Sequence, residues 1–63
     1  MDTNKKKVVV VEYDEHISKV YEIKLAKENI NAMVARDGED GVTMITAETP
    51  DLIILDLMVP KKA

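Results

Sequence analysis

Blocks of apolar residues separate polar segments along this chain and predict its strands. Two runs, Val8–Val11 and Leu52–Leu55, contain no polar residue at all. A strand with one face in water alternates apolar and polar residues, so unbroken runs are typical of strands covered on both faces, as in a parallel sheet. A third apolar block, Ala32–Ala35, gives a weaker signal and predicts a further strand. We therefore expect strands at about residues 7–12, 31–35 and 51–56.

The two segments between these strands are predicted to be helices, at about residues 14–28 and 38–48. Asp14 and Asp37 precede them, and an aspartate at that position accepts hydrogen bonds from the first free backbone N–H groups of a helix. Pro50 ends the second helix, because proline cannot continue the backbone hydrogen bonding. The first helix has an apolar face made of residues at helical spacing: Ile17, Val20, Tyr21 and Leu25.

Two smaller features of the helices can also be predicted. Glu15 and Lys19 lie four residues apart, a spacing at which opposite charges attract on a helix surface. Gly41 lies inside the second helix, where glycine costs about 1 kcal/mol relative to alanine. We expect this glycine to let the helix lie close to the sheet.

The order strand, helix, strand, helix, strand indicates an α/β fold. Short connections between alternating elements favour parallel strands joined by right-handed crossovers. The expected product is a three-stranded parallel sheet with the spatial order second, first, third. We expect one truncated domain over residues 1–63, with residues 1–6 as a disordered lead-in.

Composition narrows the class of protein further. A domain of 63 residues is small, and the chain has no cysteine for a disulfide or a zinc site. The net charge of -3 argues against direct nucleic-acid binding, which needs a basic surface. No apolar run approaches the roughly 20 residues of a membrane span, and the lysine-rich start is unlike a signal peptide. We expect a soluble, cytoplasmic protein.

Carboxylates follow two of the predicted strands. The carboxyl ends of neighbouring parallel strands meet at one edge of the sheet, so Glu12 and Asp56 are expected to lie close together. Clustered carboxylates repel one another, and Mg²⁺ relieves that repulsion. Beside Mg²⁺, Asp56 could act as a nucleophile toward phosphorus. Alternatively, Asp56 is only a helix-cap or turn residue. His16 has no catalytic partner at a recognisable spacing, so we do not expect an enzyme with its own turnover.

Four stretches of the sequence resemble the receiver domain of two-component response regulators. They are Lys7–Glu12, Asp14–Ile17, Ala35–Gly38 and Pro50–Pro60. The last stretch is close to diagnostic, because it joins a strand, an aspartate and a proline-containing loop at the spacing of that family. The resemblance covers about residues 5–62 and implies half of a flavodoxin-like fold.

The resemblance also implies roles for individual residues. Asp56 matches the aspartate that accepts a phosphoryl group from a histidine kinase. Glu12 matches the first of two adjacent acids that hold Mg²⁺, and Met58 matches the position whose backbone carbonyl is a metal ligand. The second acid of the pair is replaced by Tyr13, and a neutral phenol is a poor ligand for this ion.

The resemblance stops halfway through the receiver domain, which leaves two hypotheses for function. In the first, the chain is a receiver fragment in which phosphotransfer is impaired and Mg²⁺ binds weakly or not at all. In the second, it is a self-associating half-domain, engineered or natural, with a structural role and no phosphotransfer. The third strand, Leu52–Leu55, would then lie at the edge of the sheet and form a homodimer with a second copy.

Overall fold

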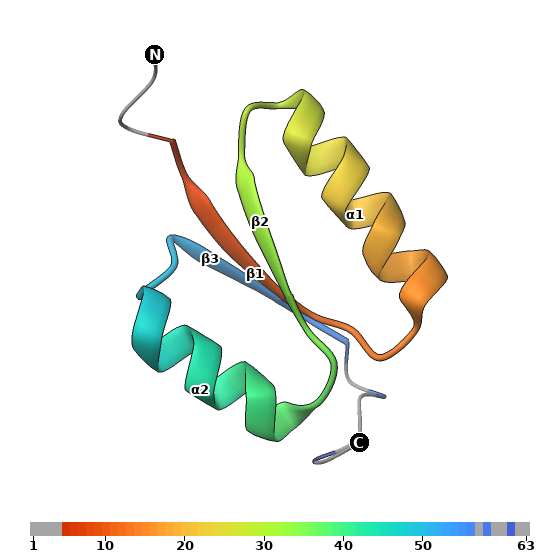
Figure 1. Cartoon of the computed structure of the whole chain (residues 1–63), viewed down its shortest axis with the longest axis vertical. Coiled ribbons are helices and arrows are strands. Elements are labelled where there is room, and N and C mark those ends of the chain that lie inside the picture. Colours follow the sequence, from red (N-terminus) through yellow and green to blue (C-terminus); the bar gives the residue numbers. More distant parts are fainter. Residues whose placement is uncertain (1–4, 57, 59–60, 62–63) are drawn as a thin grey trace.

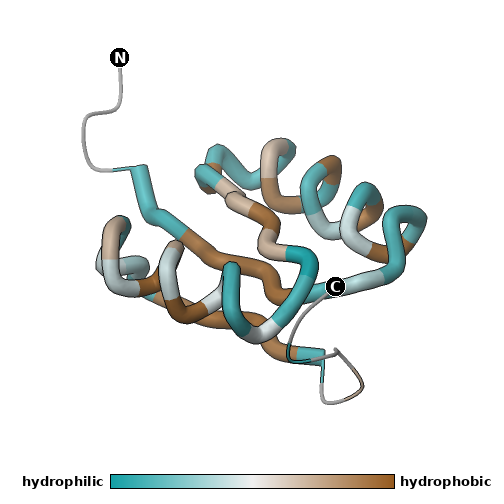
Figure 2. Tube along the Cα trace, turned by 60° about the horizontal axis from the view of Figure 1, so that its bottom comes forward, coloured by the Kyte–Doolittle hydropathy of each residue, from teal (hydrophilic) through white to brown (hydrophobic). Residues whose placement is uncertain are grey.

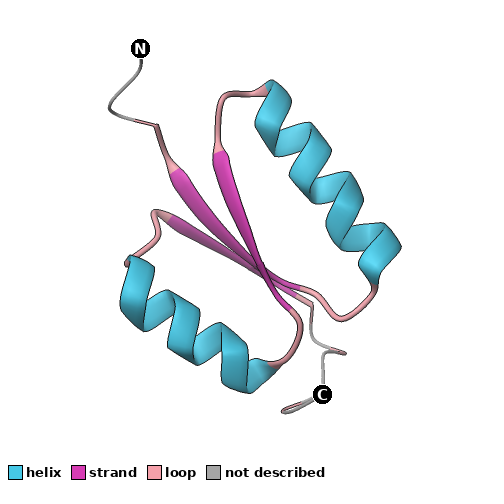
Figure 3. Cartoon of the chain, viewed as in Figure 1, coloured by secondary structure: helices cyan, strands magenta, loops and turns pink. Residues whose placement is uncertain are grey.

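The computed structural model describes residues 5–56, 58 and 61. The five predicted elements are present in the predicted order (Figure 1). They are β1 (Lys7–Val11), α1 (Glu15–Lys27), β2 (Asn31–Ala35), α2 (Gly38–Glu48) and β3 (Leu52–Leu55). Figure 3 shows how short the connecting loops are. The part of the lead-in before Lys5 lies outside the described residues.

The sheet has the order β2-β1-β3 with both pairings parallel, which confirms the predicted α/β topology. Val9 of the central strand pairs with Met33 on one side and with Ile53 on the other. The first crossover runs from the central strand β1 to β2, and the second runs from β2 back across β1 to β3, so the two run in opposite directions. Both are expected to be right-handed. The sheet consequently lies between α1 and α2 (Figure 1).

The core is built around β1. Val8–Val11 are all buried, and Val9 and Val10 are fully inaccessible. Val9 and Val11 pack with Ala35, and a ring of half-buried side chains surrounds them: Met33, Met44 and Ile45. Figure 2 shows the hydrophobic residues concentrated along the strands. The prediction that an unbroken apolar run is covered on both faces is therefore confirmed for β1.

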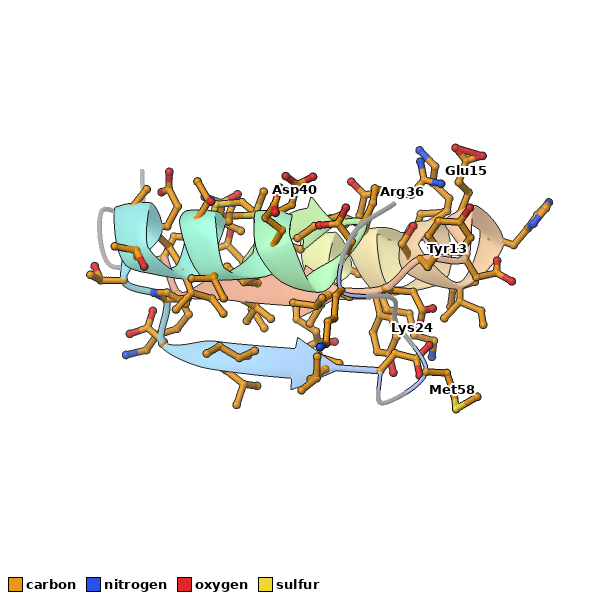
Figure 4. All side chains as sticks on the ribbon, turned by 90° about the horizontal axis from the view of Figure 1, so that it is seen from below. Tyr13, Glu15, Lys24, Arg36, Asp40 and Met58 are labelled. Atoms are coloured by element: carbon orange, nitrogen blue, oxygen red, sulfur yellow. The ribbon has the colours of Figure 1, made fainter. Side chains whose placement is uncertain are left out.

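The same prediction is wrong for β3. Leu52 and Leu55 are 57% and 55% exposed, although they belong to an equally apolar run. The two helices pack at the level of β1 and β2, and β3 lies beyond them at the edge of the sheet (Figure 4). Strand order, rather than the apolar pattern, decides which of the two runs is buried.

Both predicted N-caps are present. The Asp14 carboxylate accepts hydrogen bonds from the backbone N–H groups of His16 (2.8 Å) and Ile17 (3.2 Å). The Asp37 carboxylate accepts one from Asp40 N–H (2.7 Å). At its other end α2 stops at Thr49, whose φ of 43° lies in the left-handed region that ends many helices.

The apolar face of α1 differs from the prediction. Ile17 and Val20 are 46% and 54% exposed, whereas Ser18 is buried. The reason is that α1 packs mainly against the edge strand β2, so only a narrow side of the helix is covered. Tyr21 and Leu25, on that side, are half-buried. None of the helices in the described part of the chain has the length and hydropathy needed to cross a membrane.

Gly41 is confirmed as a point of close approach between α2 and the sheet. A Cβ atom added to this glycine would lie 3.1 Å from Cγ2 and 3.4 Å from Cγ1 of Val11. Because Val11 is on the central strand and 3% exposed, it has little room to move. The small residue thus lets the start of α2 pack directly on the end of β1, next to the edge where Glu12 and Asp56 lie.

Candidate functional site

The backbone brings Glu12 and Asp56 to the same edge of the sheet. Glu12 follows β1, and its N–H donates to the carbonyl oxygen of Ala35 (2.9 Å). Asp56 follows β3, and its N–H donates to the carbonyl oxygen of Val11 (3.1 Å). These bonds extend the sheet by one residue beyond the strands. The two carboxylates are thereby held at the carboxyl ends of adjacent parallel strands, where open α/β sheets bind their ligands.

Burial and charge both act on Glu12. Its side chain is 5% exposed, and its Oε2 accepts a hydrogen bond from Asp14 N–H (3.2 Å). Burial raises the pKa of Glu12, and the nearby carboxylates of Asp56 and Asp14 raise it further, although the bond from Asp14 N–H opposes the change. The charge of Asp56 therefore acts on Glu12 across the ends of the two adjacent strands.

Asp56 is held by the loop that follows it. Its Oδ1 accepts a hydrogen bond from Met58 N–H (2.9 Å), which is the geometry of an aspartate that starts a turn. The turn role considered for Asp56 is thus present, and it also orients the carboxylate beside Glu12. The Met58 side chain itself is 87% exposed. Leu57, Val59 and Pro60 of the same motif lie outside the described residues.

The donor set at this edge fits Mg²⁺ only partly. Mg²⁺ in proteins is commonly bound by one or two carboxylates, with water and substrate phosphate completing six oxygen ligands. Glu12 and Asp56 supply two converging carboxylates, whose mutual repulsion a cation would relieve. Among the described residues there is no group of three or more acidic, histidine or cysteine side chains that could hold a metal. Two protein carboxylates fall within the number that Mg²⁺ sites commonly use.

Tyr13 forms a separate cluster and is not part of this carboxylate pair. Its side chain is 50% exposed, and the Arg36 guanidinium lies 5.2 Å from the centre of its ring. Arg36 also pairs with Glu15, with 3.3 Å between Nη1 and Oε1. Figure 4 shows Tyr13, Arg36 and Glu15 together on one side of this edge and Met58 on the other. Such an exposed cation–π contact contributes about 0.5–1 kcal/mol.

This cluster corrects the predicted pairing of Glu15 with Lys19. Glu15 instead turns toward Arg36, and Lys19 pairs with Glu22 at 3.9 Å. No local pattern predicts this contact, because Arg36 lies 21 residues from Glu15 and meets it only through the fold. A second unforeseen contact lies nearby: Glu39 N–H, in the first turn of α2, donates to the carbonyl oxygen of Lys61 (2.8 Å).

His16 has no role at the carboxylate pair. It lies in the first turn of α1 with a fully exposed side chain, and its Nδ1 is 3.7 Å from Oδ1 of the capping Asp14. The ring therefore points into solvent at the start of the helix.

The chain is similar in sequence to a curated protein over almost its whole length. The chain is 38% identical over 61 residues to the "Probable transcriptional regulator ycf27" of Cyanophora paradoxa. The match includes 97% of this chain and 26% of the relative, so the chain spans about a quarter of the length of the curated relative. No protein-family model matches the chain.

Together, this relative and the observed fold confirm the resemblance to the receiver domain of response regulators. The chain carries the five elements of the N-terminal half of that domain, in the flavodoxin-like order β2-β1-β3.

Proposed function

We propose that this chain is the phosphoacceptor half of a response-regulator receiver domain. In this proposal a carboxylate oxygen of Asp56 attacks the phosphorus of a donor such as a phosphohistidine of a histidine kinase. A phosphorus–oxygen bond forms, the phosphorus–nitrogen bond of the donor breaks, and the leaving nitrogen takes up the electron pair. The observation that carries the proposal is the convergence of Glu12 and Asp56 at the carboxyl edge of a parallel sheet.

The residues of this chain would act mainly by positioning. Met58 N–H holds Oδ1 of Asp56 and so orients the carboxylate. Mg²⁺, when bound, would screen the negative charge of an incoming phosphoryl group. Glu12 and Asp56 would supply side-chain ligands, and the backbone carbonyl of Met58 is proposed as a third. The name of the relative suggests that the longer protein would regulate transcription.

We further propose that phosphotransfer is slow in this chain. Tyr13 replaces the second acid, and its ring packs under Arg36 instead of joining Glu12 and Asp56. One direct carboxylate ligand is therefore missing, and Mg²⁺ has a strong preference for oxygen ligands in a complete octahedral set. Weak Mg²⁺ binding would leave the repulsion between the phosphoryl group and the acids largely unscreened.

The test is to incubate the folded chain with a small acyl phosphate and Mg²⁺ and to record its intact mass with time. We expect a slow gain of one phosphoryl group that is lost when Asp56 is replaced by asparagine. The variant Tyr13→Asp should react faster and bind Mg²⁺ more tightly, because it adds a carboxylate beside Glu12. An Asp56→Asn variant that is modified as fast as the unaltered chain would overturn the proposal.

One observation favours the second candidate function, a self-associating half-domain without phosphotransfer. Three of the four residues of β3 are more than 40% exposed, namely Leu52, Ile53 and Leu55. We propose that this strand forms a homodimer, which is compatible with either a phosphorylated or an inert Asp56. If neither the unaltered chain nor Tyr13→Asp gains a phosphoryl group from the acyl phosphate, self-association remains as the proposed function.

A further inference from the structure

A backbone hydrogen bond joins the segment that follows Asp56 to the first turn of α2. Glu39 N–H donates to the carbonyl oxygen of Lys61 (2.8 Å). The first N–H groups of a helix have no acceptor inside the helix, so each needs one from elsewhere. For Glu39 that acceptor comes from a residue that follows β3 in the sequence. The bond therefore links α2 to the segment after β3, at the edge of the sheet that carries the two carboxylates.

The first turn of α2 is itself fixed relative to β1. Gly41 packs against the side chain of Val11, which is 3% exposed. Asp37 closes the turn, because its Oδ1 accepts from Asp40 N–H (2.7 Å) and its carbonyl oxygen accepts from Gly41 N–H (2.9 Å). Glu12 follows Val11 directly in the chain. A group bonded to this turn is thus held in a fixed place relative to Glu12.

Met58 and Lys61 belong to the same short segment after Asp56. Met58 N–H donates to Oδ1 of Asp56 (2.9 Å) and so orients the carboxylate. The carbonyl of Met58 is the third Mg²⁺ ligand in the proposed function. Lys61 is three residues farther along the chain, and three residues span at most about 10–11 Å when fully extended. An anchored Lys61 therefore limits the positions that both backbone groups of Met58 can reach.

We infer that the backbone N–H of Glu39 is a positioning group for Mg²⁺ binding at the carboxylate pair. It holds Lys61 against α2, which restricts the Met58 carbonyl to the neighbourhood of the two carboxylates. The inference rests on the proposed function and deepens it, because it adds a group that acts through Met58 and touches neither the metal nor phosphorus. The alternative is that the bond only caps the helix and has no effect on the site.

Thermodynamic linkage gives the inference a quantitative form. If the bond between Glu39 and Lys61 favours Mg²⁺ binding by some factor, bound Mg²⁺ must favour the bond by the same factor. A bond that only caps the helix has a coupling factor of one. The affinity for Mg²⁺ and the opening of the bond can be measured separately, so two independent values of the factor must agree.

The first experiment removes the donor with a single substitution. The bond uses only the backbone of Glu39, whose side chain is exposed. Glu39→Pro deletes the N–H, and proline is tolerated in the first turn of a helix because no intrahelical bond is lost there. The comparison variant is Glu39→Gln, which loses the same charge and keeps the N–H.

Mg²⁺ affinity is measured for both variants by a titration that follows the Met58 amide signal by NMR. We expect Glu39→Pro to bind Mg²⁺ roughly fivefold or more weakly than Glu39→Gln, the lower end of typical coupling between sites. Urea unfolding of the same variants shows any loss of stability separately. Equal Mg²⁺ affinity of the two folded variants would overturn the inference, whatever their stabilities.

The second experiment uses the unaltered chain, so it does not depend on the folding of Glu39→Pro. Hydrogen exchange of Glu39 N–H reports the opening of its bond to Lys61, because no carbonyl of α2 accepts this N–H. We expect the exchange to slow as Mg²⁺ is added, by the factor found in the first experiment, and to lose this dependence in Asp56→Asn. Exchange that is unchanged at saturating Mg²⁺ would overturn the inference and leave the proposed function standing. A chain that neither binds Mg²⁺ nor gains a phosphoryl group would overturn both.

Discussion

Replacement of Gly41 by alanine tests how closely α2 packs on the central strand. In an unconstrained helix interior this change stabilises by about 1 kcal/mol. Here the added Cβ would lie 3.1 Å from Cγ2 of Val11, closer than ordinary van der Waals contact. Overpacking of a well-filled core costs about 1–3 kcal/mol. We therefore expect Gly41→Ala to lower the free energy of unfolding, by about 1 kcal/mol after the gain in helix propensity is subtracted.

The assay is urea unfolding followed by circular dichroism at one fixed protein concentration, because self-association would shift the apparent stability. Thr46→Ala is the matched control, since Thr46 is exposed on the same helix and gains helix propensity of about 0.5 kcal/mol without a new contact. A Val11→Ala background removes both close Cγ atoms and should turn the effect of Gly41→Ala into stabilisation. The reasoning is refuted if Gly41→Ala alone stabilises the chain as much as Thr46→Ala does.

Two further predictions concern the carboxylates. Because the pKa of Glu12 is raised above 4.5 in the folded chain, its stabilising contribution is complete below that pH and is lost as the pH rises through the higher folded value. Glu12→Gln should therefore raise the free energy of unfolding at neutral pH and change it less at acid pH. Urea unfolding that shows the same difference between the two chains at both pH values would contradict this. Asp14→Ala removes the N-cap of α1 and should cost about 1 kcal/mol, whereas Asp14→Asn should cost much less; equal losses for the two variants would exclude capping as the cause.

Local sequence signals predicted the elements well because their causes are local. Asp14 and Asp37 cap their helices through bonds to residues two or three positions away, so the chain around each aspartate contains the whole interaction. Alternation of strands and helices likewise sufficed for the sheet order, since crossover handedness leaves few arrangements. The closeness of Glu12 and Asp56 could also be predicted, because the sheet order places the carboxyl ends of β1 and β3 side by side.

Burial and long-range contacts could not be predicted in the same way. Val8–Val11 and Leu52–Leu55 have the same apolar pattern, yet one run is the core and the other is exposed, because burial depends on which strand is central. The Arg36 contacts to Glu15 and Tyr13 also depend on tertiary placement. At Tyr13 the resemblance led only to the prediction that an acidic metal ligand is absent, and the structure shows the ring beside Arg36.

The most direct test of the central claim is to find which side chain receives the phosphoryl group. After reaction with a small acyl phosphate and Mg²⁺, the modified chain should be digested and its peptides mapped, with and without hydroxylamine, which cleaves acyl phosphates. The account predicts a single hydroxylamine-labile group on Asp56. A phosphoryl group on Tyr13, His16 or Ser18, with Asp56 unmodified, would contradict it.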